Sequence, residues 1–107
     1  MAYRVLLIEQ AEHDISTIHH YIAAADSRAA ADQVVAELEA ACASLADLPS
    51  RGRVPTELRS LGVTGCREIR WKPYRILYRI EGSQVLVNCV LDGRRDVESL
   101  LRRRLLR

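Results

Sequence analysis

The sequence lacks the patterns that build disulfide frameworks, zinc sites or membrane spans. Its three cysteines, Cys42, Cys66 and Cys89, are widely spaced and form no C-x-x-C pair, which argues against a disulfide scaffold and a zinc site. No apolar run approaches the ~20 residues of a membrane-spanning helix. The N-terminal residues also lack the small-residue cleavage site of a signal peptide. We therefore expect a cytoplasmic protein without metal or other cofactor and without a membrane partner.

Lysine is almost absent, because Lys72 is the only basic residue that is not arginine. Residues 1–50 contain two arginines and eight acids, a net charge of −6, whereas residues 51–107 contain fourteen basic residues and six acids, a net charge of +8. The planar guanidinium group suits carboxylates and phosphates. The second half is therefore expected to face an acidic or polyanionic partner, with an ordinary solvated basic face as the alternative.

The apolar periodicity of the first half predicts one strand and two helices. At 107 residues the chain is expected to form a single domain, residues 1–107, with one core. Residues 3–8 are β-branched and aliphatic and predict a strand. A helical stripe begins at Ala11, with Glu12 and Asp14 on other faces, and a second stripe ends near Leu45. A break at 24–29, where Asp26 or Ser27 can cap the second helix, indicates a helical hairpin.

The second half alternates short β-rich runs with turn residues and predicts an antiparallel meander. The runs cover residues 64–71, 74–80 and 84–92. Lys72–Pro73 ends the first run, since proline has no N–H to donate to a ladder. The third run is apolar on both faces, so we expect it to be central or covered. The final residues, 96–107, predict a short basic helix.

Two arginines are spaced for the same side of the second run. Arg75, Leu77 and Arg79 share one face of that strand, and its tyrosines and isoleucines share the other. The overall order is β-α-α-β-β-β-α, with one helical turn expected at 56–61 in the connection over residues 48–62. Segregated helices and strands indicate an α+β fold in which an antiparallel sheet packs on the helical hairpin. The strand order does not follow from the sequence.

This order of segments resembles the RelE/ParE family of bacterial toxins, the toxin halves of type II toxin–antitoxin pairs. The resemblance covers nearly the whole chain and depends on several short motifs in sequence order. They are "A..DI..I..YI", "L..LP..GR.P.ELR..G", "REIRW.PYRILYRI" and "V.V..V.DGRRD". The connection and the "RRD" ending resemble the ParE branch more than the RelE branch.

The two branches differ in activity, since RelE-type toxins cut messenger RNA in the ribosomal A site and ParE-type toxins poison DNA gyrase. RNA cleavage needs a base, a group that stabilises the added charge on the phosphate, and an acid. By resemblance, Arg70, Arg75 and Arg95 match basic residues of the nuclease branch. Glu68 stands where that branch has a base, and Leu101 stands where it has a tyrosine. The charge-stabilising residues are thus present while the proton-transfer residues are replaced.

The resemblance therefore implies a ParE-like toxin that binds DNA gyrase as a protein target and traps its cleaved-DNA complex. A cognate antitoxin would neutralise it in a hetero-oligomer. Two alternatives stay open. One is a RelE-like ribosome-dependent mRNA endoribonuclease that acts through Glu68, Arg70, Arg75 and Arg95, and the other is an inactive, toxin-like interaction module. Whether the chain is an enzyme stays undecided at this point, with no confident catalytic residue.

The candidate contacts to a target or antitoxin lie in the basic second half. An antitoxin segment is expected to wrap the toxin, with acidic and apolar residues that suit the basic sheet and the groove of the hairpin. Alternatively, Arg75 and Arg79 form a solvated edge or pair with Glu68 and Glu81. The candidates are Arg67, Arg70, Trp71, Arg75, Arg79, Arg94, Arg95, Arg102, Arg103 and Arg104.

Overall fold

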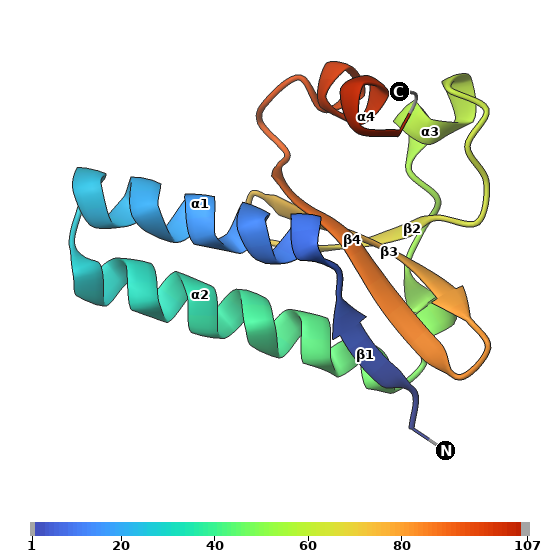
Figure 1. Cartoon of the computed structure of the whole chain (residues 1–107), viewed down its shortest axis with the longest axis horizontal. Helices are drawn as coiled ribbons and strands as arrows, with labels where there is room; N and C mark the ends of the chain where they lie inside the picture. Colours follow the sequence, from blue (N-terminus) through green and yellow to red (C-terminus); the bar gives the residue numbers. More distant parts are fainter. Residues whose placement is uncertain (1, 106–107) are drawn as a thin grey trace.

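A computed structural model describes residues 2–105 of the chain (Figure 1) and confirms the predicted element order. The elements are β1 (Arg4–Leu7), α1 (Glu9–Ala25), α2 (Arg28–Ala43), α3 (Thr56–Ser60), β2 (Arg67–Trp71), β3 (Tyr74–Glu81), β4 (Gln84–Asp92) and α4 (Val97–Leu105). Two 3₁₀ turns, η1 (Ser44–Ala46) and η2 (Pro49–Arg51), follow α2. The expected end of the last helix, Leu106 and Arg107, lies outside the described residues. None of the helices over residues 2–105 combines the length and the hydropathy that a transmembrane span requires.

The helical hairpin forms where the apolar stripes predict it. Ser27 caps α2, because its hydroxyl oxygen accepts a hydrogen bond of 3.0 Å from the backbone N–H of Ala30. Helix α1 begins at Glu9, two residues before the first position of its stripe. Asp96 caps α4 in the same way, accepting at 3.1 Å from the N–H of Ser99.

The sheet has the strand order β1-β4-β3-β2, which the sequence did not predict. Strands β2, β3 and β4 form the expected antiparallel meander. The expectation of a fully antiparallel sheet is wrong for β1, which runs parallel to β4. A parallel pair needs a long connection, and the hairpin and the meander together provide one between these two strands. Strand β4 is central, as its apolar character predicted.

Both faces of the sheet are covered, by different helices. Helices α1 and α2 pack on one face, and α3 and α4 lie together on the other side, above the sheet in Figure 1. An irregularity in the β3–β4 register, opposite Leu77 and Tyr78, lets β4 present apolar residues to both layers. The core on the hairpin side comprises Ala11, Ile15, Leu38, Cys42, Leu45, Tyr74, Ile76, Tyr78, Val85, Val87 and Val90. The core on the α3–α4 side comprises Leu58, Cys66, Leu77, Cys89, Leu91, Val97 and Leu101.

A buried carboxylate joins three elements that are distant in sequence. Asp14, which was expected on a face of α1 outside the apolar stripe, is buried. Because β1 ends at Leu7, the part of β4 beyond Val87 has no strand partner on that side. Helix α1 crosses β4 there, and Asp14 accepts a 3.0 Å hydrogen bond from the N–H of Val90. Arg104 of α4 donates to both oxygens of Asp14, at 2.8 and 2.7 Å. Asp14 thus fixes α4 over the sheet.

A buried tyrosine holds the connection between α2 and β2. The Tyr78 hydroxyl donates to the carbonyl oxygen of Pro49 at 2.5 Å and accepts from the N–H of Gly52 at 3.0 Å. One residue later, Arg53 forms a two-way antiparallel backbone bridge with Glu68 of β2. The connection is therefore fixed against the edge strand of the sheet.

Candidate functional site

The centre of the candidate site is Arg75, which lies inside the protein with only 4% of its surface exposed. Its Nε donates to Glu68 at 2.6 Å, and its two terminal nitrogens bind both oxygens of Glu57 of α3, at 2.7 and 2.8 Å. A bidentate pair of this kind is among the stronger hydrogen-bond arrangements in proteins. The aliphatic part of Arg75 lies against Gly93, where an added Cβ would come within 3.0 Å of it. All three guanidinium nitrogens of Arg75 are therefore already bound within the protein.

Two further arginines surround the buried Glu68 from the solvent side. The side chain of Glu68 is fully buried, and its second oxygen lies 3.1 Å from Nε of Arg53 and 3.8 Å from Arg70. Arg70 is half exposed, at 50% of its side chain. We refer to Arg53, Glu57, Glu68, Arg70 and Arg75 as the Arg75 cluster. It holds three cations and two carboxylates, and its unneutralised charge lies on the exposed Arg53 and Arg70.

The Arg75 contact shifts the titration of Glu57. The hydrogen bond from Arg75 lowers the pKa of Glu57 from its ordinary 4.5 to about 2, although partial burial opposes that shift. Because the folded-state pKa lies below the ordinary value, the ionised carboxylate stabilises the fold above pH 4.5. This contribution is lost progressively as the pH falls through about 2.

Acid unfolding should report this shift. We expect the free energy of unfolding, measured in urea, to fall between pH 4.5 and pH 2 in the wild-type protein. A Glu57→Gln variant should be less stable at neutral pH and should show a shallower fall over that window. The matched control is Glu12→Gln, which changes an exposed carboxylate of α1 and should keep the wild-type slope. An unchanged slope in Glu57→Gln would contradict the assignment.

The other candidates on β2 and β3 lie in different surroundings. Arg67 is on the hairpin side of β2 and donates to the carbonyl oxygen of Gly52 at 2.8 Å. Trp71 is half buried, stacks on Tyr74 with ring centroids 6.3 Å apart, and has Nζ of Lys72 5.3 Å from its ring centre. Arg79 pairs with Glu81 at 2.6 Å. The structure thus contains both pairs that the sequence left open, Arg75 with Glu68 and Arg79 with Glu81.

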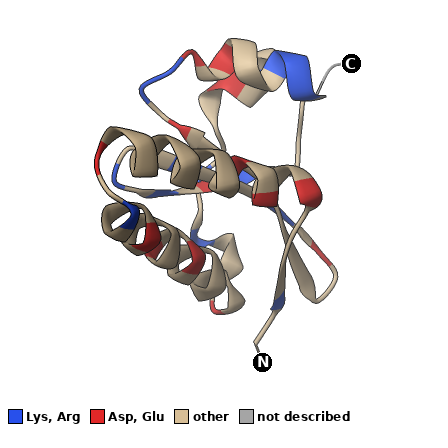
Figure 2. Cartoon of the chain, turned by 60° about the vertical axis from the view of Figure 1, so that its left-hand side comes forward, with Lys and Arg blue, Asp and Glu red and all other residues tan. Residues whose placement is uncertain are grey.

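The remaining candidate arginines belong to the loop before α4 and to α4 itself. Figure 2 shows them as blue segments apart from the acidic residues of the helical hairpin. Arg94 is exposed and pairs with Asp92 at 2.7 Å, and Arg95 and Arg103 are exposed. Arg102 lies 3.7 Å from Glu98, whereas Arg104 is held by Asp14. The ten candidates therefore do not form one continuous surface. Arg70 and Arg75 lie together in the Arg75 cluster, whereas Arg94, Arg95 and the arginines of α4 are not part of that cluster.

Sequence reasoning missed two residues of the Arg75 cluster, Arg53 and Glu57, and the buried Asp14 that holds Arg104 of α4. Arg53 and Glu57 lie in the irregular connection, where no periodicity connects them to β2 or β3. A signal existed for Asp14, which stands three residues after the buried Ala11 and directly before the buried Ile15. A carboxylate at that spacing lies on the core side of a helix and indicates a buried partner.

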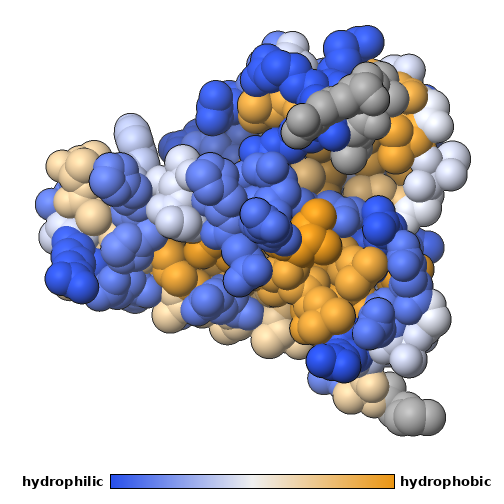
Figure 3. All heavy atoms as spheres, viewed as in Figure 1, coloured by the Kyte–Doolittle hydropathy of each residue, from blue (hydrophilic) through white to orange (hydrophobic). Residues whose placement is uncertain are grey.

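A hollow lies between the helices of the hairpin. Figure 3 shows apolar side chains on this face, around β1 and the two helices. Leu7, Ile15 and Val35 line a pocket of about 280 Å³ there, with the polar residues Glu12, Ser16, His19 and Glu39 around it. This pocket lies where the sequence predicts a groove of the hairpin, and the binding of an antitoxin there stays a prediction.

Two solved structures from toxin–antitoxin systems share this architecture. A chain of the chromosomal ParDE system from P. aeruginosa superposes with a TM-score of 0.71 at 17% identity, covering 83% of this chain and 94% of its own. A chain of the RelBE2 complex from Mycobacterium tuberculosis superposes with a TM-score of 0.61 at 21% identity, covering 84% and 96%. The fold is therefore that of the ParE- and RelE-like proteins. No curated protein matches the sequence.

The sequence itself identifies the branch. The family model described as "ParE toxin of type II toxin-antitoxin system, parDE" matches residues 5–97, which is most of the chain. The chain belongs to the ParE toxin family of type II toxin–antitoxin systems.

Proposed function

We propose that this toxin inhibits DNA gyrase by binding it as a protein target, so that gyrase remains on cleaved DNA, and that a cognate antitoxin neutralises it in a hetero-oligomer. Its place of action would be the cytoplasm, where gyrase acts on the chromosome. The toxin itself would contribute contact surface and no catalytic residue. Membership of the ParE family supports this proposal.

The observation that carries the proposal is that Glu57 and Glu68 occupy all three guanidinium nitrogens of Arg75. A nuclease needs a cation that can approach the scissile phosphate and stabilise the charge that develops there. Here the guanidinium in that position is buried and bound by two carboxylates, at 2.6 to 2.8 Å. Leu101, at the expected tyrosine position, is fully buried in the core beneath α4. This arrangement favours a binding protein over the RelE-like alternative.

The exposed arginines around α4 are the proposed gyrase contacts. Arg95 and Arg103 are exposed and carry no partner in the described residues, so they are free to pair with carboxylates of another protein. Reversing such a peripheral charge typically slows association and weakens binding. Arg95→Glu and Arg103→Glu should therefore raise the toxin concentration needed for inhibition.

The test is a supercoiling assay with purified gyrase and relaxed or supercoiled plasmid. We expect inhibition of supercoiling and accumulation of cleaved DNA, reduced in Arg95→Glu and Arg103→Glu and unchanged in Arg4→Glu, which makes the same charge change on β1. Primer extension on a translated message forms the second arm. A-site cuts without any effect on gyrase would contradict this proposal and favour the RelE-like ribonuclease. If both effects are absent and cells that express the chain grow normally, the remaining hypothesis is an inactive, toxin-like interaction module.

A further inference from the structure

Helices α3 and α4 form a layer that is attached to the sheet more loosely than the helical hairpin is. The two helices contact each other and share the small core on their side of the sheet (Figure 1), where they bury Leu58, Val97 and Leu101. Between residues 2 and 105, no backbone hydrogen bond connects either helix to a strand. Segments with few buried apolar contacts open at a lower free energy than the whole protein unfolds. This layer has that character.

Two ion pairs of opposite polarity hold the layer in place. On α3, Glu57 binds Arg75 of β3 at 2.7 and 2.8 Å. On α4, Arg104 binds Asp14 of α1 at 2.8 and 2.7 Å. In both pairs the partner outside the layer is buried, and the partner on the helix lies closer to solvent. Because the helices share one core, withdrawing either of them uncovers apolar side chains of the other, and the two pairs are expected to break together.

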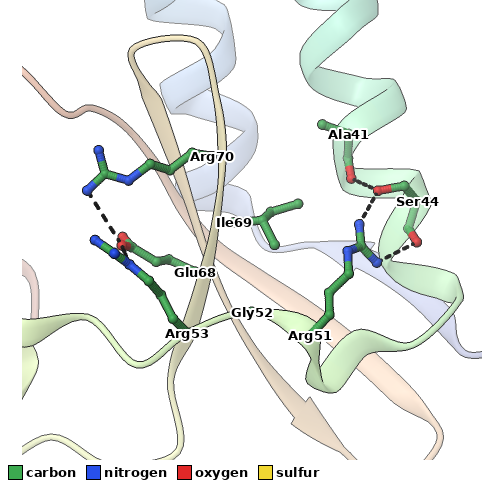
Figure 4. Close-up of a pocket in the computed structure, with 8 residues that line it drawn as sticks. All are labelled: Ala41, Ser44, Arg51, Gly52, Arg53, Glu68, Ile69 and Arg70. Atoms are coloured by element: carbon green, nitrogen blue, oxygen red, sulfur yellow. Dashed lines mark hydrogen bonds and ion pairs between the residues drawn. The ribbon is translucent and has the colours of Figure 1, made fainter.

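The chain that leads into α3 is fixed, whereas the chain that leaves it has room to move. Figure 4 shows Arg51 in contact with the residue after α2, and Arg53 in contact with Glu68 of β2. Beyond α3, Gly62 and Gly65 have φ values of +72° and +79°, and a Cβ added at either would have no atom within 4 Å. Glycine adopts positive φ without steric cost. The segment between these two glycines is therefore a suitable hinge.

We propose that α3 and α4 form a lid that detaches from the sheet as one unit while the hairpin and the sheet stay folded. Opening of the lid withdraws Glu57 and exposes two guanidinium nitrogens of Arg75. Glu57 is thus an autoinhibitory contact, because the closed lid keeps this cation from any other anion. Opening also uncovers Leu77 and Leu91 of the sheet and moves Arg103 relative to it. The inference concerns the free toxin and does not rest on the proposed function.

The three cysteines of the chain are built-in reporters of the lid. Cys66 and Cys89 are buried in the core beneath it, whereas Cys42 is buried in the core of the hairpin. Burial raises the pKa of Cys42 and of Cys66 to about 11 and also raises the pKa of Cys89, so all three are unreactive thiols in the closed protein. Trypsin cleavage after arginine places them in three separate peptides, residues 29–51, 60–67 and 80–94.

The experiment labels the folded wild-type protein with a bulky aromatic maleimide and follows each thiol by mass spectrometry of its peptide. Each rate is divided by the rate of the same thiol in urea-unfolded protein. We expect Cys66 and Cys89 to share one relative rate, at least about tenfold above that of Cys42, which reacts only after global unfolding. The shared rate should also rise less steeply with urea, since lid opening exposes less surface. Equal relative rates for all three thiols would overturn the lid.

Variants at the two ion pairs test whether α3 and α4 move together. Glu57→Gln weakens the attachment of α3, and Arg104→Gln weakens that of α4. A hydrogen bond between charged groups contributes roughly tenfold or more to an equilibrium constant. Each variant should therefore speed the labelling of both Cys66 and Cys89 by about tenfold. Acceleration of only one thiol, or of neither, would show that the helices do not open as one unit.

Two controls separate lid opening from a general loss of stability. Glu12→Gln changes an exposed carboxylate of α1 and should leave all three rates unchanged. Val35→Ala removes apolar contacts of the hairpin core, which the open form retains, so it should speed Cys42 and leave Cys66 and Cys89 unchanged. If Val35→Ala speeds all three thiols equally, their exposure comes from global unfolding and the inference is wrong.

Thermal unfolding of each variant verifies its fold, and the comparison of the three thiols in the wild-type protein does not depend on any variant. The experiment uses neither gyrase nor an antitoxin. A negative result would therefore leave the gyrase assay untouched, and a negative gyrase assay would leave the labelling result standing.

Discussion

Replacing Arg75 with methionine is expected to lower the free energy of unfolding by about 3–5 kcal/mol. The substitution leaves the fully buried carboxylate of Glu68 with only the partly exposed Arg53 and Arg70 nearby, and it removes both hydrogen bonds that tie Glu57 of α3 to the sheet. An uncompensated buried charge is among the few causes of losses this large. Urea unfolding at neutral pH measures the change.

The matched control is Arg79→Met, because Arg79 lies on the same face of the same strand and also pairs with a glutamate. Its side chain and that of Glu81 are each about half exposed, at 47% and 54%. Loss of an exposed pair typically costs less than about 1 kcal/mol. Adding Glu68→Leu to Arg75→Met should recover part of the lost stability, because it removes the unpaired carboxylate. An Arg75→Met protein as stable as the wild type would show that the Arg75 cluster does not support the fold.

The same pair of variants bears on function. If Arg75 acted on a substrate, its replacement would abolish activity in a protein that remained folded. If Arg75 only holds α3 and β2 together, activity and stability should fall in parallel, and the Glu68→Leu rescue should restore both in part. Measuring growth inhibition beside urea unfolding therefore separates a reactive arginine from an arginine that acts through the fold.

Replacing Gly52 with alanine is expected to cost about 2–4 kcal/mol, because no space is available for a methyl group. The added Cβ would collide with the hydroxyl of Tyr78 and would lie 2.8 Å from the carbonyl oxygen of Glu68. The backbone at Gly52 has φ −69° and ψ 156°, which any residue can adopt, so the cost comes from space alone. Thermal and urea unfolding measure it.

Two comparisons test this steric explanation. Ser50→Ala changes an exposed residue of the same connection and should alter stability by less than about 0.5 kcal/mol. Tyr78→Phe destabilises the protein by itself, because it removes the hydrogen bonds to Pro49 and Gly52. In the Tyr78→Phe background, however, Gly52→Ala should cost less than it does in the wild type, since the hydroxyl is gone. Additive effects of the two substitutions would exclude a direct clash with the Tyr78 hydroxyl.

Local patterns predicted the elements of this fold well. The alternation in β3 predicted that Tyr74 and Ile76 lie on one face and Leu77 on the other, because side-chain direction in a strand has a period of two residues. The structure confirms this separation, with the first two residues on the hairpin side. The apolar character of β4 on both faces correctly predicted a covered, central strand. Ser27 was one of two caps considered for α2, and it is the one that the structure uses.

Long-range pairing was not predictable in the same way. No local signal indicates that β1 pairs with β4, since the helical hairpin, the connection and two strands separate them in sequence. Glu57 binds Arg75 from a short helix that follows an irregular connection, so neither periodicity nor sequence distance relates the two residues. The resemblance to toxins indicated the position of Arg75 but not its burial, because burial depends on α3 and Gly93 from other parts of the chain.

The contact between Asp14 and Arg104 also constrains when the toxin can finish folding. Ninety residues separate the two partners, and a ribosome releases the chain from its N-terminal end. During synthesis Asp14 of α1 therefore leaves the ribosome before its partner Arg104 has been made. The apolar residues of β4 that face α4 likewise stay uncovered until α4 has been made. For that interval the nascent chain exposes the apolar residues that α4 later covers, so folding can be completed only after the C-terminal helix has left the ribosome.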